Sequence, residues 1–444
     1  MAFVSGGAHH VRWRRNAASS MRRREIDCST CALRARAAPG IALEAKDHDR
    51  SGGELNDAVS QLQRSNDAVQ VLGVVKQYRR ILRAQHVAPH LERVSRWLMQ
   101  SQLGPESECD RDDTLDEQIW ETMVWPTLVQ AMEWQSKAGT PAAPAEKIAM
   151  HVINTLHAAA LLFPGKVLPR PRTGKRVAAH RLLTGRLSQL ERVCSYLDAQ
   201  RSEWHEDTVL ISRLWWACVC LGVQRMPHGV EAHMKSLPFE LHPCLLGSDK
   251  KKMELSVQQL VKEIELKHDT INVNGKQVKE LRQTAWMSTT RSFEYSGKTM
   301  PPLPFSPTVE RVRETLKREL GLDFDGCLIN YYEDGKVAMS YHQDPDMGTI
   351  WEHDTCVVSV GATRVFCARR VPSVALGVPE TTETSTEPDR YEFCVRDTDV
   401  LHMKHDCQRL FEHCIKKMKG KSFAGPRISL VFKKAIIPAP QDQT

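Results

Sequence analysis

The sequence predicts an α+β protein in which an all-helical N-terminal region precedes a domain of two packed β-sheets. Two observations support this. Between residues 56 and 245, apolar side chains recur mostly at three- and four-residue spacing, which is the helical period. From residue 327 onward, short runs of β-type residues alternate with turns, as in a double-sheet jelly roll or barrel. At 444 residues with 41% hydrophobic side chains, the chain has room for both parts.

The bulk composition narrows the class of partner and compartment. The net charge of +7 mildly favours an acidic partner such as nucleic acid. Thirteen cysteines without a regular spacing indicate a reducing, intracellular compartment, either nucleus or cytoplasm. No apolar stretch reaches the length of a membrane span, so we expect no membrane partner. The sequence leaves the oligomeric state open.

Residues 1–55 lack hydrophobic periodicity, and we expect them to be a disordered basic segment. Residues 1–24 are rich in arginine and contain no acid, which is typical of an organelle transit peptide. The alternative is a basic tail that helps to hold nucleic acid. We assign no metal or redox role to the C-x-x-C motif at Cys28 and Cys31.

Residues 56–245 are expected to form a helical domain whose role the sequence does not reveal. Pro126 is expected to interrupt a helix between Leu115 and Trp134. Between Met150 and Leu190 the chain carries basic residues and no acid, so this part is either a phosphate-contacting surface or a solvated basic face. The basic residues are Lys166, Arg170, Arg172, Lys175, Arg176, Arg181 and Arg186.

Residues 255–436 carry the β-type pattern, and residues 437–444 are expected to be a tail. A helix is predicted at Thr308–Leu320, a hairpin at Asn274-Gly275 and an inserted surface loop at Gly377–Arg390. The predicted strands are Cys327–Tyr332, Val337–His342, Thr355–Val360, Arg364–Ala368, Tyr391–Val395, Val400–Met403 and Arg427–Phe432.

The most informative motif is the His-x-Asp pair of His342 and Asp344. Residues two apart in an extended stretch point to the same face, so an imidazole and a carboxylate lie side by side. This suits a divalent metal such as iron(II), and a distant histidine would complete a two-His-one-carboxylate triad. A later segment offers His402, His405 and His413, of which His405 would serve only if the strand register shifted.

A late arginine, Arg427, follows on the terminal strand, and its planar fork would grip the far carboxylate of a dicarboxylate cosubstrate. Asn330 and Tyr332 lie on one face of their predicted strand and would donate further hydrogen bonds to that ligand.

With these residues assembled, the chain resembles the AlkB family of iron(II)- and 2-oxoglutarate-dependent dioxygenases over roughly residues 270–435. The matching blocks occur in the family's order. They are Arg282-Gln-Thr-Ala-Trp286, Asn330-x-Tyr332-x-x-Gly335, His342-Gln-Asp344-x-Asp346, Ser359 to Phe366, Gln408 to His413 and Arg427-x-Ser-x-x-Phe432. The resemblance implies a double-stranded β-helix (jelly-roll) dioxygenase domain at residues 255–436.

The resemblance also implies the site residues and the cofactors, which are Fe(2+), 2-oxoglutarate and O2. The implied metal ligands are His342, Asp344 and His413. The implied cosubstrate residues are Asn330, Tyr332, Arg427 and Lys433. The implied substrate residues are Trp286, which stacks on the base, Asp346, which reads a cationic methylated base, and the lid residues Arg282, Phe293 and Tyr295. The chain departs from the family at Lys433, where an arginine is usual, so the charge is kept and the fork is lost.

The implied reaction is oxidative demethylation of N-alkylated bases, such as N1-methyladenine or N3-methylcytosine, in DNA or RNA. It would release formaldehyde, succinate and CO2, and a base of single-stranded DNA or RNA would be flipped into the pocket. Two alternatives stand beside it: a dioxygenase acting on a protein side chain, and a catalytically silent nucleic-acid-binding module. Trp286 has its own alternative, that of a packed lid residue.

Overall fold

The computed structural model describes residues 48–82, 86–91, 93–94, 118–133, 145–162, 177–247, 249–273, 275–371, 389–418 and 425–436. The predictions for residues 1–47, the loop 377–388 and the tail 437–444 lie outside these residues. Most of the basic side chains between Met150 and Leu190 also lie outside them. Arg186 is described, and it forms an ion pair with Glu121.

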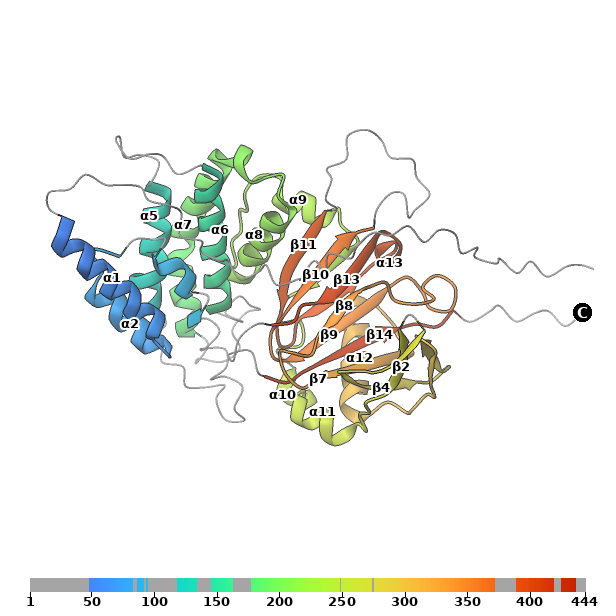
Figure 1. Ribbon diagram of the computed structural model, residues 1–444. Coiled ribbons are helices and arrows are strands. Elements are labelled where there is room, and N and C mark those ends of the chain that lie inside the picture. Colours follow the sequence, from blue (N-terminus) through green and yellow to red (C-terminus); the bar gives the residue numbers. More distant parts are fainter. Residues whose placement is uncertain are drawn as a thin grey trace, which may run out of the picture. The chain divides into compact units, whose positions relative to one another are not determined.

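The first part of the described chain is built from helices (Figure 1). They are α1 (His48–Arg64), α2 (Ala68–Gln77), the π-helix η1 (Trp120–Val124), α5 (Trp125–Glu133), α6 (Ala145–Leu162), α7 (Val177–Ala199), the 3-10 helix η4 (Arg201–Glu203), α8 (Thr208–Leu221) and α9 (Val230–Lys235). Local chemistry sets the ends of α8. The Asp207 side chain accepts hydrogen bonds from the first free N–H groups, and Gly222 ends the helix in the left-handed conformation. None of the helices described is long and apolar enough to cross a membrane.

The predicted interruption at Pro126 takes the form of a π-helix rather than a break. The N–H of Trp125 bonds to the carbonyl of Trp120, five residues earlier, and α5 continues directly. Proline has no N–H and crowds the carbonyl four residues before it, and one wider turn accommodates both.

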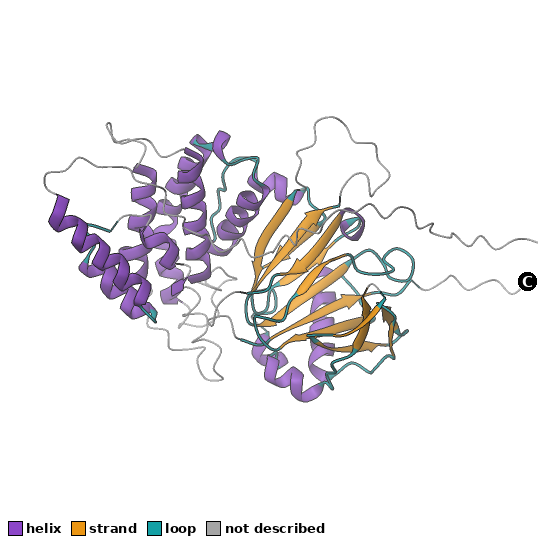
Figure 2. Ribbon diagram, viewed as in Figure 1, coloured by secondary structure: helices purple, strands orange, loops and turns teal. Residues whose placement is uncertain are grey.

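The rest of the chain forms two antiparallel sheets, which appear as two layers of strands in Figure 2. The six-stranded sheet has the order β1 (Phe239–His242), β12 (Val400–Met403), β9 (Thr355–Gly361), β14 (Arg427–Lys433), β7 (Gly326–Tyr332), β4 (Gln283–Ser288). The four-stranded sheet has the order β11 (Arg390–Val395), β10 (Arg364–Arg370), β13 (Phe411–Ile415), β8 (Met339–His342). Two hairpins, β2–β3 (Thr270–Val273, Lys276–Lys279) and β5–β6 (Phe293–Tyr295, Lys298–Met300), and the helices α10 (Lys250–Met253), α11 (Val257–Glu263), α12 (Pro307–Leu320) and α13 (Cys407–Leu410) complete the fold.

Strand β1 differs from the sequence prediction, because it lies inside the range 56–245 that was predicted to be helical. It is an edge strand, antiparallel to β12, with Phe239 opposite Met403. It does alternate apolar and polar residues, but over only four positions. Its partner lies about 160 residues later, beyond the reach of a local pattern.

The two faces of the six-stranded sheet have different environments. On β14, Ile428, Leu430 and Phe432 are buried in a core with residues of α11 and α12. Because side chains alternate along a strand, Arg427 and Lys433 point to the opposite, inner face. Both are buried, so the charged groups of β14 lie on the inner side.

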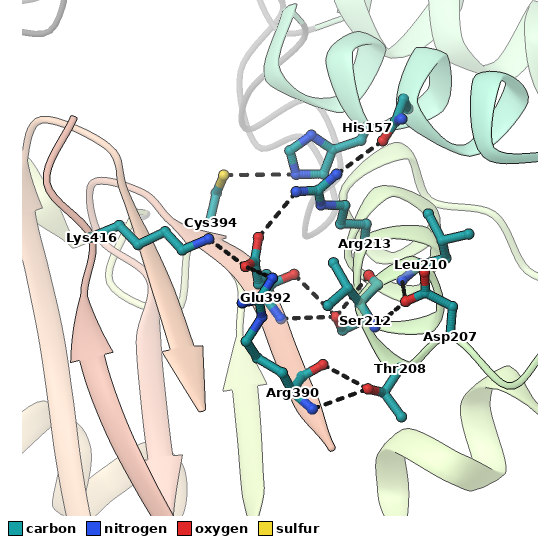
Figure 3. Close-up of polar contacts among 12 residues, drawn as sticks. His157, Asp207, Thr208, Leu210, Ser212, Arg213, Arg390, Glu392, Cys394 and Lys416 are labelled. Carbon is teal, nitrogen blue, oxygen red and sulfur yellow. Dashed lines mark hydrogen bonds and ion pairs between the residues drawn. The ribbon is translucent and has the colours of Figure 1, made fainter. Parts of the chain in front are cut away.

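Helix α8 packs against the edge strand β11 (Figure 3). The hydroxyl of Thr208 accepts from the N–H of Arg390 and donates to its carbonyl. Ser212 makes the same pair of bonds with the backbone of Glu392. Two hydroxyls one helical turn apart therefore take the place of a neighbouring strand on this edge.

Candidate active site

Three predicted metal ligands meet at the end of β8. His342 is the last residue of β8 and lies directly opposite His413 on β13, while Asp344 follows two residues later. The Nε2 atoms of His342 and His413 lie 3.6 and 3.8 Å from Oδ1 of Asp344. All three ligand atoms lie within 4.8 Å of one another, as coordination of one ion requires.

The environment of each imidazole leaves a ring nitrogen able to coordinate a metal. Nδ1 of His342 lies 2.9 Å from the carbonyl oxygen of Ser340. With the proton on Nδ1, the lone pair of Nε2 faces the cluster. Burial, and then the neighbouring His342, lower the pKa of His413 to about 3, so this ring is neutral and able to coordinate. His405, the alternative third ligand, is exposed and lies outside the cluster.

The Asp344 carboxylate has a second partner, Lys433. The Lys433 ammonium, 1% exposed in its side chain, donates to Oδ2 of Asp344 at 2.6 Å. Burial alone would raise the pKa of Asp344, but Lys433 and the two histidines bring it well below its ordinary value. Oδ2 is thus held by the lysine while Oδ1 faces the imidazoles. Lys433 was expected to hold the cosubstrate, and in the structure its ammonium pairs with the carboxylate of Asp344.

A second group of residues forms a buried cationic site on the inner face. Arg427 is fully buried and donates from Nη2 to the hydroxyl of Ser359, whereas its Nε and Nη1 have no hydrogen-bond partner in the part of the chain that the structure describes. Its guanidinium lies over the ring of Tyr332 at 5.3 Å, and that of Arg364 lies 5.4 Å from the same ring. Among the described residues, no carboxylate forms an ion pair with either arginine.

The electrostatics of this pair favour an anion. Burial lowers the pKa of Arg427, and burial together with Arg427 lowers the pKa of Arg364 to about 10. Both guanidinium groups keep buried N–H donors without a hydrogen-bond partner among the described residues, at Nε and Nη1 of Arg427 and at Nε of Arg364. Two neighbouring buried cations of this kind are stabilised by a carboxylate ligand. Arg364 lies in the block Ser359 to Phe366, which matches the family, but the sequence alone assigned it no role. Its burial depends on bonds to the carbonyls of Asp334, Val337 and Lys416, which no local pattern reveals.

Comparisons with known proteins agree with this geometry. A family model described as the 2OG-Fe(II) oxygenase superfamily matches residues 240–433. The uncharacterized protein R406 of Acanthamoeba polyphaga mimivirus is 35% identical over 178 residues, covering 39% of this chain and 85% of that protein. The DNA oxidative demethylase ALKBH2 of Bos taurus is 29% identical over 37% of this chain. The alpha-ketoglutarate-dependent dioxygenase alkB homolog 3 of Bos taurus is 26% identical over 44% of this chain.

The chain belongs to the AlkB family of 2-oxoglutarate- and iron(II)-dependent oxygenases. It spans 55% of the length of the ALKBH2 relative and 65% of that of alkB homolog 3. The family uses Fe(2+), 2-oxoglutarate and O2. The residues of this chain fit those groups, because the His-Asp-His cluster offers a metal three ligands and Arg427 offers a dicarboxylate two unpaired donors. The expected class, a 2-oxoglutarate-dependent dioxygenase, is confirmed.

The lid residues of this AlkB-family chain take positions that differ from the prediction. Arg282 donates from Nε to Oδ1 of Asn330 at 2.8 Å and forms an ion pair with the buried Glu280 at 2.9 Å. The Tyr295 hydroxyl donates to the same Glu280 carboxylate. Both side chains therefore belong to a network of hydrogen bonds and ion pairs around Glu280, which Arg282 connects to Asn330. They were expected to contact the substrate, and the structure gives them a supporting position.

Trp286 and Phe293 are packed into a small apolar core. They are 1% and 2% exposed, and their rings stack on each other with centroids 4.9 Å apart. Trp351 packs edge-on against Trp286 at 5.3 Å, and Nε1 of Trp286 donates to the carbonyl of Arg291. The expectation that Trp286 stacks on a base is not supported by this arrangement, which favours the packed-residue interpretation. Trp351 arrives from a distant loop and was not anticipated.

Asp346 is the predicted substrate residue that stays accessible. It is exposed, with a φ of 58° in the left-handed region, and its carbonyl accepts from the N–H groups of Ile350 and Trp351. The strained turn therefore sets the direction of an accessible carboxylate two residues beyond Asp344.

Proposed function

We propose that this protein oxidatively demethylates N-alkylated bases, such as N1-methyladenine or N3-methylcytosine, in single-stranded DNA or RNA. The products would be the repaired base, formaldehyde, succinate and CO2. One observation supports this most directly: a convergent His342-Asp344-His413 cluster accompanies a buried arginine with unpaired donors. The named activity of the ALKBH2 relative, DNA oxidative demethylation, supports a nucleic-acid substrate.

We infer that the two sheets form the double-stranded β-helix of this family, and that the dioxygenase domain runs from residue 239 to residue 436. The start is moved from the predicted residue 255 because β1 completes the six-stranded sheet. In this arrangement the metal ligands come from the four-stranded sheet and the loop after β8. The cosubstrate residues come from β7 and β14 of the six-stranded sheet.

The proposed roles follow from chemistry at named atoms. Nε2 of His342, Nε2 of His413 and Oδ1 of Asp344 would hold Fe(2+), which when bound supplies the oxidation of the methyl group. Lys433 keeps Oδ2 of Asp344 occupied and so fixes the direction of Oδ1. Nε and Nη1 of Arg427 would receive the far carboxylate of 2-oxoglutarate.

Asn330 and Tyr332 would complete the dicarboxylate site. Tyr332 lies directly opposite Arg427 in the β7–β14 ladder, and Asn330 lies two residues away on the same face. Arg282 already occupies Oδ1 of Asn330, so the amide NH2 group remains as the donor available to the ligand.

We assign recognition of the base to Asp346. N1-methyladenine and N3-methylcytosine are cationic, and an exposed carboxylate attracts and orients such a base. The target would be flipped out of any base stacking before it reaches the metal. Trp286 and Phe293 do not enter this proposal, since both ring systems are packed against neighbouring aromatics.

A protein side chain is the second candidate substrate. The observation that favours it is the same packing, because the expected aromatic stacking surface for a base is occupied. A cationic methylated side chain would also be attracted by Asp346.

The test is an assay of the untagged full chain with iron(II), 2-oxoglutarate and single-stranded oligonucleotides that carry either methylated base. Mass spectrometry of the nucleosides and quantification of succinate are read in parallel. We expect loss of one methyl group for each coupled succinate, and abolition in Asp344→Asn. The matched control is His405→Ala, which alters an exposed histidine outside the cluster and should keep full activity.

Each negative result of this assay points to a different alternative function. Substrate-independent succinate with every methylated base intact would overturn the nucleic-acid proposal and favour a protein substrate. No succinate under any condition, with oligonucleotide binding retained, would favour the catalytically silent binding module. Asp346→Asn should reduce turnover of the cationic bases, with a higher KM, while uncoupled succinate formation persists.

A further inference from the structure

A second cluster of ligand-type side chains lies at the β1–β12 edge of the six-stranded sheet. Glu240 and His402 are directly opposite each other in the ladder, and His242 lies two residues beyond Glu240 on the same face. The alternate residues of β1, Phe239 and Leu241, point the other way, into the core shared with the four-stranded sheet. The cluster therefore lies on the outer face, opposite the catalytic residues.

The geometry of this cluster resembles a ligand set rather than a closed hydrogen-bond network. The ligand atoms of Glu240, His242 and His402 all lie within 4.8 Å of one another. Nε2 of His242 lies 3.9 Å from Oε1 of Glu240, which is too long for a hydrogen bond. That nitrogen is buried and has no hydrogen-bond partner among the described residues. A buried, unpartnered nitrogen that faces a carboxylate is satisfied when an ion lies between them.

A fourth residue supports one of the imidazoles. Oδ1 of Asp354 lies 3.0 Å from Nε2 of His402. A carboxylate that fixes one nitrogen of a histidine orients the other toward a metal and makes it a stronger donor.

We propose that Glu240, His242 and His402 form a second metal site that takes Zn(2+) or a similar divalent transition ion. Two imidazoles and one carboxylate are ligands that zinc prefers, with a fourth position left for water. Such an ion would join β1, an edge strand with a single neighbour, to β12. The expected role is to hold in place the strand through which the chain enters the sheet.

Lys404 allows a metal site to be distinguished from a network of hydrogen bonds. Its ammonium pairs with the Glu240 carboxylate through Oε2, while Oε1 faces His242. A cation beside the carboxylate weakens the binding of another cation. Removal of the lysine charge should therefore tighten metal binding, whereas it would only weaken a network of hydrogen bonds.

The experiment uses untagged, chelator-treated full chain with the catalytic site disabled by Asp344→Ala and His413→Ala. Zn(2+) binding is followed by calorimetry, and Co(2+) binding by its visible absorption. In this background we expect one equivalent to bind at this site and a rise in Tm with added Zn(2+). His242→Ala with His402→Ala should remove that equivalent and the Tm rise.

Two milder variants serve if the double histidine variant does not fold. Glu240→Gln, at a half-exposed position, should weaken binding by roughly tenfold or more. Lys404→Gln should tighten it, and His405→Ala should leave it unchanged. Equal stoichiometry and affinity in Glu240→Gln and Lys404→Gln, or no binding in the parent background, would overturn the site.

Discussion

At the scale of single residues, the two oxygens of Asp344 have different partners. Oδ2 accepts from Lys433 at 2.6 Å, and Oδ1 lies 3.6 Å from Nε2 of His342. Lysine is a point charge that satisfies one oxygen, whereas the planar fork of an arginine engages two. Lys433 therefore engages Oδ2 and leaves Oδ1 facing the two imidazoles.

Replacing this lysine tests its role. In Lys433→Met the chain length is nearly kept, but Asp344 loses the cation that holds it. We expect iron(II) affinity to fall roughly 10- to 100-fold, in line with the loss of a residue that orients a metal ligand. Anaerobic iron titration measures this. Lys434→Met is the matched control, since Lys434 is half-exposed and pairs with Glu352. Equal iron affinity in both variants would contradict the role.

Gly326 lies against the aromatic core of Trp286. A Cβ at this position would lie 2.4 Å from Cη2 of Trp286, closer than real side chains approach. Because Trp286 is itself held by Phe293 and Trp351, it cannot move aside freely. Gly326→Ala should lower the free energy of unfolding by about 1–3 kcal/mol, measured by urea denaturation. The control is Gly73→Ala, where a Cβ would meet nothing within 4 Å.

Sequence reasoning can predict geometry where a short spacing fixes it. The two-residue interval between His342 and Asp344 anticipated their common direction, and motif order anticipated His413 over His405. It cannot show an environment that comes from distant segments. Trp351 packs against Trp286 from another loop, and Glu280 pairs with Arg282 and accepts from Tyr295. A sequence pattern contains no record of those neighbours.

At the scale of elements, the contact between α8 and β11 centres on a buried carboxylate. Glu392 is 3% exposed in its side chain and pairs with Arg213 of α8 at 3.0 Å (Figure 3). Lys416 and Arg390 pair with the same carboxylate. Burial alone would raise the pKa of Glu392, but Lys416 and Arg213 more than offset it, and the pKa is lowered.

The lowered pKa of Glu392 determines how the stability of the protein changes with pH. Because the folded-state pKa is depressed, the contribution of Glu392 is present above its unfolded pKa of about 4.3 and is lost as pH falls through the folded value. Glu392→Gln should cost about 3 kcal/mol at pH 7 and show a shallower loss between pH 5 and pH 3, measured by urea unfolding. Glu231→Gln, in an exposed pair with Lys235, should change stability little. A parallel acid limb in Glu392→Gln would contradict the assignment.

Runs of β-type residues beyond residue 327 were predicted at nearly their observed positions, as Val400–Met403 shows. The missed elements are those with weak local signals. Strand β1 has four residues, and the π-helix η1 is a response to the proline that follows it. Both depend on partners or geometry that become visible only in three dimensions.

At the scale of the whole molecule, the helices and the sheets share one hydrophobic core. Buried residues of α8 and α6 belong to the same apolar cluster as Phe239, Phe393 and Phe411 of the sheets. Trp215 of α8 packs edge-on against Phe393 at 6.0 Å. The helical region is thus part of the support of the oxygenase domain rather than an independent attachment.

Truncation tests this dependence. A fragment of residues 236–444 keeps every strand but loses α8, which exposes the edge of β11 and the apolar surface beneath it. We expect this fragment to aggregate, as seen by light scattering, because a bare edge strand pairs with other chains. A fragment of residues 200–444 keeps α8 and α9 and should aggregate less. A soluble, cooperatively unfolding 236–444 fragment would contradict the shared core.

The contact between α8 and β11 can form only late in synthesis of the chain. Ser212 bonds to the backbone of Glu392, which lies 180 residues later. At about 5–20 residues per second, α8 leaves the ribosome roughly 10–35 seconds before its strand exists. Throughout that interval the face of α8 that will cover β11 has no native partner.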